Sequence, residues 1–189
     1  MKTQPPRTFS VGMTTYTSVN VIIWGEIEKH EGVEFNLVSF NGGNPARLAL
    51  AGKHIDLVMP GLYAGQPIWE YVRFLAVAQP ENLWKDQTDN APTLNEAMGY
   101  ELPNASDSTS LFVPAGFSKQ YPARHKKFVD AFLKVLKDPD YLANLEKLGQ
   151  SKRIFPRTPE ESQKLFEEEV AMYKENLATF KKTLEQQVR

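Results

Sequence analysis

Two short polar turns, "GMTTYTS" (12–18) and "NGGN" (41–44), carry the residues best suited to holding a small molecule. Each turn follows a short apolar run typical of a buried strand, and each leads into a helical pattern. A helix N-terminus presents unpaired backbone N–H groups and a partial positive charge, so two such ends that converge can bind an anion without lysine or arginine. The threonine and serine hydroxyls add donors, and the turns therefore favour an anion.

The two turns are expected to lie side by side, because the carboxyl ends of parallel strands share one edge of a sheet, where open α/β sheets bind ligands. Gly42 and Gly43 let the backbone approach a ligand, and Tyr16 can form a wall. An alternative reading is that the turns are only helix caps and tight turns. We predict a ligand-binding site made of Thr14, Thr15, Tyr16, Thr17, Ser18, Asn41, Gly42, Gly43 and Asn44.

Catalytic and metal-binding patterns are not found in the sequence. The three histidines have no partner at helical spacing, and there is no H-E-x-x-H, G-x-S-x-G, P-loop or G-x-G-x-x-G motif. The chain has no cysteine, which excludes disulfides and thiolate ligands. We therefore expect no enzymatic activity, no catalytic residue, no cofactor and no metal.

The composition is that of an ordinary globular protein. The chain has 189 residues, 41% of them hydrophobic and 24% charged, with a formal net charge of −1. Such a balance creates no global basic field, so nucleic acid is not an expected partner. No stretch approaches the length of apolar sequence that a membrane span requires.

Strand and helix signals alternate over the first half of the chain. Strands are predicted at 8–12, 34–40, 55–59, 72–78 and 110–114. Between them, helices are predicted at 18–30 with Ser18 as N-cap, and at 46–51 with Asn44 as N-cap and Pro45 at the first helical position. A capping box at 93–96 opens a further helix to Met98. The alternation predicts an α/β fold with a mostly parallel sheet.

The second half is predicted to be helical. Helices are expected at 122–137, then up to Leu148, and from a capping box at 158–161 into the 180s. The predicted domains are an α/β ligand-binding lobe at 8–115 and a C-terminal helical segment at 116–189.

Several of these segments, in this order, resemble the solute receptors of tripartite tricarboxylate transporters, also called Bug proteins. Typical family patterns are an aromatic-x-Gly-Gly-x-x-Ala turn, a Gly-x-x-Asp-x strand entry, "RALAV", "PTxxEAG" and "GLFAPAG". Their counterparts here are 40–46, 52–57, 73–77, 92–99 and 111–116, and residues 14–18 correspond to the small-residue turn before a helix. The resemblance extends from about Thr8 to the 180s.

The resemblance implies a type 2 periplasmic-binding-protein fold, in which two α/β lobes close on a small carboxylated solute. It also implies a periplasmic protein that delivers its ligand to membrane transporter subunits. In the family, the two turns belong to the second lobe and hold a carboxylate of the ligand. The helices after Tyr121 would pack on the first lobe.

The chain departs from the family in two ways. The first turn is poorer in glycine, so Met13 and Tyr16 can narrow the pocket. The family's opening third has no counterpart, which implies a truncated form whose C-terminal helices lack a surface to cover. We therefore expect self-association, or folding of these helices back over the sheet, through an apolar stripe that includes Phe128, Phe132, Val135 and Leu136.

Two functions of different classes remain. The favoured one is a solute-binding receptor component for an organic acid. The alternative is the effector-sensing lobe of a transcription regulator with the same fold class, which would need a DNA-binding element, and none precedes Thr8 in this sequence.

Overall fold

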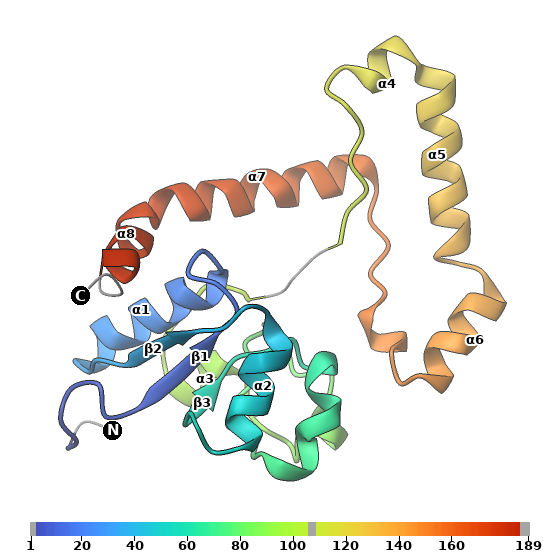
Figure 1. The fold of residues 1–189 in the computed structure, drawn as a ribbon. Coiled ribbons are helices and arrows are strands. Elements are labelled where there is room, and N and C mark those ends of the chain that lie inside the picture. The colour runs from blue at the N-terminus through green and yellow to red at the C-terminus, as the bar shows by residue number, and fades with distance from the viewer. Residues whose placement is uncertain (1–2, 106–108, 186–189) are drawn as a thin grey trace. The chain divides into compact units, whose positions relative to one another are not determined.

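The chain forms two compact units, each of which is described by itself (Figure 1). The computed structural model describes residues 3–105 and 109–185. The first unit consists of residues 1–107 together with 172–189, and the second of residues 108–171. The sequence-based division at 115/116 differs from this one, because the last helix belongs to the first unit.

A small parallel sheet forms the centre of the first unit. Its strands are β1 (Ser10–Met13), β2 (Asn36–Ser39) and β3 (Leu57–Val58), in the order β2-β1-β3. Ser10 pairs with Asn36 and Met13 with Ser39, while Val11 pairs with Leu57. The predicted α/β class and the parallel direction of the first three strands are confirmed.

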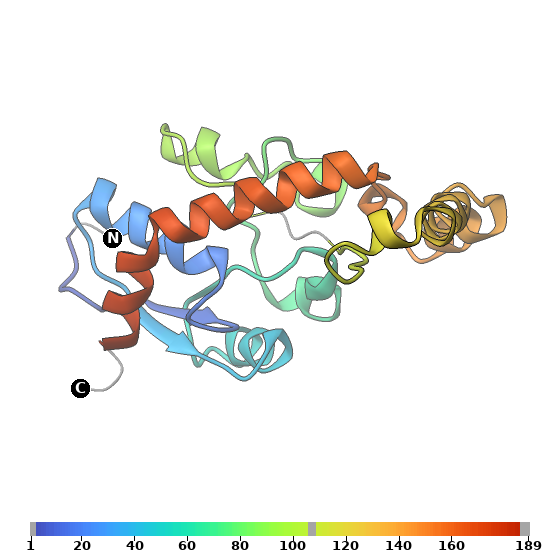
Figure 2. The ribbon, with the colours of Figure 1, turned by 90° about the horizontal axis from the view of Figure 1, so that it is seen from above.

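Helices α1 (Val19–Glu31) and α2 (Gly43–Ala51) lie on opposite faces of this sheet (Figures 1 and 2). As predicted, α1 follows Ser18 and ends at Gly32, whose φ of 64° is readily adopted only by glycine. Helix α2 begins earlier than predicted, because its N-cap is Gly42 at φ 101° rather than Asn44. Pro45 lies in the first turn of this helix. A proline is accommodated there because the first amides of a helix have no intrahelical acceptor, so its missing N–H costs no hydrogen bond.

The hydrophobic core of the first unit surrounds α1. It combines Val11 and Met13 of β1 with Ile22 and Ile23 of α1, and it includes Phe180 of α8 (Leu177–Glu185). Helix α8 packs closely on α1, because a Cβ atom added to Gly25 would lie 2.9 Å from Thr179 Cγ2. α1 is therefore buried from more than one side.

Gly12 allows close packing in the middle of the sheet. A Cβ atom at this position would lie 2.4 Å from Ile55 Cδ1 and 3.3 Å from Phe40 Cε2. The side chains of Ile55, just before β3, and Phe40, just after β2, therefore occupy the space that a residue larger than glycine would need.

The segment between β3 and the end of the first unit is irregular, with two 3-10 helices, η1 (Tyr63–Tyr71) and η2 (Lys85–Gln87), and the short α3 (Leu94–Met98). The predicted strand at 72–78 is wrong. Within it, Val77 forms an isolated bridge with Thr93, and its N–H donates to Pro92 O at 2.9 Å. Its backbone groups are bonded to the residues before α3, so the segment does not extend the sheet.

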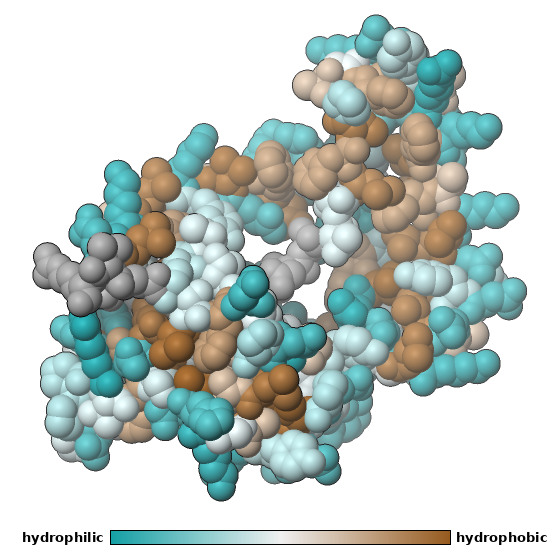
Figure 3. Space-filling model, in the orientation of Figure 1, coloured by the Kyte–Doolittle hydropathy of each residue, from teal (hydrophilic) through white to brown (hydrophobic). Residues whose placement is uncertain are grey.

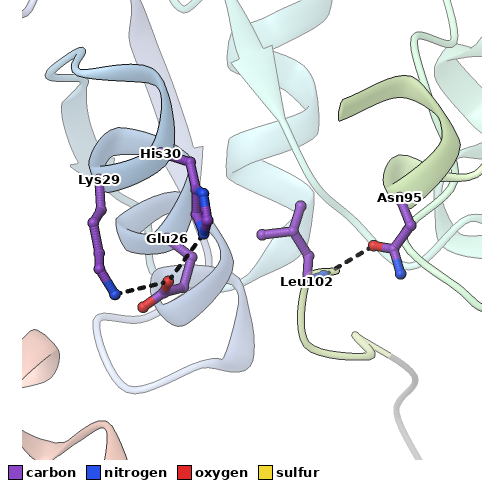
Figure 4. Close-up of polar contacts among 5 residues, drawn as sticks. All are labelled: Glu26, Lys29, His30, Asn95 and Leu102. Atoms are coloured by element: carbon purple, nitrogen blue, oxygen red, sulfur yellow. Dashed lines mark hydrogen bonds and ion pairs between the residues drawn. The ribbon is translucent and has the colours of Figure 1, made fainter. Parts of the chain in front are cut away.

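Polar and aromatic contacts tie the segment around α3 together and to α1 (Figure 4). Leu102 N donates to Asn95 Oδ1 at 3.1 Å, which holds the chain after α3 against that helix. The His30 ring of α1 stacks on Tyr100 at a centroid distance of 4.2 Å. His30 Nε2 also lies 3.9 Å from Glu26 Oε2. This histidine therefore has a structural role.

The second unit is built from helices: α4 (Phe117–Gln120), α5 (Pro122–Val135), α6 (Pro139–Lys147), the 3-10 helix η3 (Ser151–Arg153) and most of α7 (Pro159–Glu175). Asp138 caps α6, and the predicted capping box of Thr158 and Glu161 opens α7. The predicted strand at 110–114 is wrong. Leu111 and Phe112 are 71% and 76% exposed, with no neighbouring strand to pair with among the residues described.

The last predicted helix is divided in two. Chain direction changes at Asn176, whose side-chain amide donates to Met172 O at 2.9 Å (Figure 1). After this break, α8 places Phe180 and Thr183 in buried positions of the first unit. The boundary between the two units lies just before this break, between residues 171 and 172, in the last turns of α7.

Candidate functional site

The two polar turns lie at one edge of the sheet. β1 ends at Met13 and β2 at Ser39, and these two residues are paired in parallel strands. Immediately beyond them, Phe40 N donates to Met13 O at 2.9 Å. The turns at 14–18 and 41–44 thus start from adjacent strand ends, as the sequence predicts.

Direct contacts join the two turns. The Tyr16 hydroxyl accepts a hydrogen bond of 3.1 Å from Ser39 N. A Cβ atom added to Gly43 would lie 3.6 Å from Thr14 Cγ2. The hydroxyl of the half-buried Tyr16 thus connects the first turn to the end of β2, and its predicted role as a wall of a pocket stays a prediction.

Hydroxyl groups organise the first turn from within. Thr15 Oγ1 lies 3.1 Å from Thr17 Oγ1 and accepts a hydrogen bond from Thr17 N at 3.2 Å. Ser18 Oγ donates to Thr15 O at 3.2 Å. Thr15 and Ser18 therefore shape the turn, while Thr15 and Thr17 remain exposed to solvent.

Neither helix that starts at these turns is capped by a side chain. Ser18 occupies the N-cap position of α1 and Gly42 that of α2, and neither helix receives a side-chain cap hydrogen bond. By contrast, Thr93 caps α3 and Asp138 caps α6. The first amides of α1 and α2 thus lack the side-chain acceptor that satisfies these other helix ends.

Arg47 adds a positive charge that the sequence-based site did not include. Its guanidinium donates to Asn44 Oδ1, and a Cβ atom added to Gly43 would lie 2.8 Å from Arg47 Nη1. Among the described residues, no carboxylate forms an ion pair with it. Helical spacing could have indicated this residue from the sequence. Residues three and four apart on a helix are neighbours, so Arg47 is expected beside Asn44 and Gly43.

A third loop reaches the same edge. Asn20, in the first turn of α1, donates to Met59 O at 2.7 Å, just beyond β3. With strand order β2-β1-β3, the chain passes from β1 to β2 on one side and then returns past β1 to β3 on the other side, and ligands of open α/β sheets bind at such a reversal. The start of α1 is therefore fixed beside the position that this topology favours.

Two carboxyl groups with shifted pKa values lie elsewhere and have structural roles. Asp56 accepts hydrogen bonds from the hydroxyl and the N–H of Ser10, at 2.6 and 2.8 Å, and these bonds lower its pKa. Burial raises the pKa of Glu28, although the hydrogen bond from Phe35 N opposes this shift. Both groups hold strands and helices of the first unit together.

Other kinds of site are not apparent in the described part of the chain. No group of three or more histidine or acidic side chains there is arranged to hold a metal ion. None of the helices described has the length and apolarity to cross a membrane. Two open depressions, of about 470 and 420 Å³, lie in the second unit, and no residue of the two turns lines either of them.

Comparison with known proteins assigns no relationship. No family model, no curated protein and no solved structure matches this chain.

Proposed function

We propose that this protein is the solute-binding receptor component of a tripartite tricarboxylate-type transporter, and that the two turns hold a carboxylate of a small organic solute. The observation that carries the proposal is the closeness of the two turns that lead into the uncapped helices α1 and α2, because Thr14 and Arg47 both lie beside Gly43. In this proposal the first unit is a lobe of a type 2 periplasmic-binding fold, which acts in the periplasm and delivers its solute to membrane transporter subunits.

The chemistry of the edge suits a carboxylate. Backbone amides at a helix N-terminus and a guanidinium group both donate hydrogen bonds to anions, and Arg47 can bind both oxygens of one carboxylate. Binding is non-covalent and requires no cofactor. A single lobe supplies only part of a ligand's contacts, so we expect weak affinity.

A thermal-shift screen with succinate, citrate, benzoate, nicotinate and glutamate tests the proposal. An acid that binds only the native state stabilises it by about 2.7 kcal/mol at one hundred times its Kd. We expect at least one of these acids to raise the Tm. Arg47→Gln, which keeps a polar, hydrogen-bonding side chain but removes the charge, should raise the Kd for this acid about tenfold or more.

Arg73→Gln is the matched control, because Arg73 is an exposed arginine of the first unit outside the three loops at the site edge. It should respond to the acid as the wild type does. Equal stabilisation of the wild type, Arg47→Gln and Arg73→Gln would place binding elsewhere, and no response to any acid would contradict the proposed function.

A further inference from the structure

The second unit exposes a continuous apolar face on α5. We define the α5 strip as Tyr121, Phe128, Phe132 and Val135, whose spacing of seven, four and three residues places them on one side of the helix. Their exposed fractions range from 39% to 63%. Figure 3 shows apolar surface along this helix.

Helix α5 lacks the packing that normally stabilises a helix of its length. It has 14 residues, and none of them is buried. A helix this short is only marginally stable in water unless an apolar face packs against another surface. A partner that covers the α5 strip would supply this missing stabilisation.

A suitable receiving surface lies on the same unit. A depression of about 470 Å³ is formed by Ile154, Phe155, Pro156 and the first turns of α7, including Leu165. This volume can accept an aromatic side chain such as Phe128. We call this depression the α7 hollow.

The segments around α5 and α7 carry opposite net charges, whereas the hollow itself is lined by both signs: Arg157 and Lys164, and Glu161 and Glu168. Residues 117–137 carry six lysines and arginines and one aspartate, whereas residues 159–171 carry five glutamates and one lysine. Lys126 pairs with Asp130 on α5, and Lys164 pairs with Glu168 on α7. Lys127 and Lys134 are adjacent in sequence to Phe128 and Val135, and form no ion pair with the described residues.

We propose that a second copy of this chain covers the α5 strip, with the strip of each copy in the α7 hollow of the other. Both complementary surfaces belong to one unit, so a single twofold axis satisfies each strip and each hollow at once. The three aromatic side chains of the strip have areas of roughly 150 to 250 Å² each, and at exposed fractions of 39% to 63% the whole strip offers on the order of 300 to 400 Å² of apolar contact per copy. A standard interface buries about 800 Å² per partner, so the strip would supply about half of it and the charged residues around the strip and the hollow would supply the rest.

Sedimentation equilibrium of the full chain over a range of concentrations tests the dimer. The wild type should dimerise, and the dimer should weaken as salt screens the opposing charges. Phe128→Ser should raise the dimer Kd at least about tenfold, as expected for an aromatic anchor. Leu75→Ser, which changes a residue that is 61% exposed in the first unit, should leave the Kd unchanged.

A charge exchange tests which surfaces meet. One variant carries Lys127→Glu and Lys134→Glu, and the other carries Glu167→Lys and Glu168→Lys. Each alone should dimerise at least about tenfold more weakly, because like charges face each other. An equimolar mixture should recover a heterodimer, since every reversed α5 then meets a reversed α7.

Circular dichroism of each variant confirms that its helices are retained. A monomeric wild type at all concentrations would overturn the proposal. So would a dimer that Phe128→Ser does not weaken, or a mixture of the two charge variants that remains as weak as its components.

Discussion

The two units differ in burial but not in the quality of their helix ends, which shows that helix capping does not depend on a packed core. Helices α1 and α5 have 13 and 14 residues, but α1 contributes six residues to buried positions and α5 contributes none. Caps and end signals occur in both units, at Thr93 in the first and at Asp138 and Thr158 in the second. Local signals therefore fix where helices start, while burial decides which helices carry the stability of the chain.

The largest expected difference between the units is in the effect of removing a large apolar side chain. Ile22→Ala in the core of the first unit should lower the free energy of unfolding by about 2 to 5 kcal/mol. Phe132→Ala on α5 should lower it by less than about 1 kcal/mol in dilute monomer, because surface positions contribute little. Urea titration followed by tryptophan fluorescence measures this, since Trp24, Trp69 and Trp84 all lie in the first unit.

The same titration repeated by circular dichroism, which detects the helices of both units, is the control. Equal losses for the two substitutions in dilute monomer would contradict the distinction between a packed unit and an uncovered one.

A smaller difference is expected at the two capping boxes. Thr93 Oγ1 accepts from Glu96 N and Thr158 Oγ1 accepts from Glu161 N, each at 3.2 Å. Replacing either threonine by alanine should cost its helix about 0.5 to 2 kcal/mol. Thr93→Ala should shift the fluorescence titration, whereas Thr158→Ala should only accelerate hydrogen exchange in the first turns of α7.

Serine at either position keeps the capping oxygen and is the matched control. If Thr158→Ala shifts the fluorescence transition as much as Thr93→Ala does, the two units unfold as one cooperative body.

The smallest effects are expected from changes of pH. They test how two carboxyl groups contribute to the stability of the first unit. Hydrogen bonds from Ser10 lower the pKa of Asp56 below 3.8, so its stabilising contribution is present above that pH and is lost as the pH falls through the folded-state pKa. Burial raises the pKa of Glu28 above 4.5, so its contribution is greatest below that pH and is lost as the pH rises through the folded-state pKa.

Urea titrations between pH 3 and 6 should therefore show opposite changes of slope. Asp56→Asn should reduce the loss of stability at the acid end, and Glu28→Gln should reduce the loss as the pH rises above 4.5. Slopes identical to those of the wild type in both variants would exclude these two carboxyl groups as the source of the pH dependence.

The sequence predicted the elements whose signals are local or strictly patterned. The first three strands, the start and end of α1 and both capping boxes follow from short runs and terminal residues, and the structure contains them. The exposed stripe on α5 was also expected, and Phe128, Phe132 and Val135 are indeed exposed. Self-association through it stays a prediction.

Errors arose where a residue's role depends on a distant partner. The apolar runs at 72–78 and 110–114 have strand-like composition, but strand formation needs a neighbour, and neither run pairs with a strand of the sheet. The predicted site placed both turns at one edge, yet it omitted Arg47 and Asn20. Their importance comes from the bonds to Asn44 and to Met59 that folding creates.

The position of α8 has a consequence for the order of biosynthesis. Its buried residue Phe180 completes a core whose other buried residues all precede residue 108. During translation the sheet and α1 leave the ribosome first, and an apolar side of α1 remains open until more than seventy further residues have been made. The nascent chain therefore passes through a long interval in which a chaperone, or premature contact with another chain, can occupy the place reserved for α8.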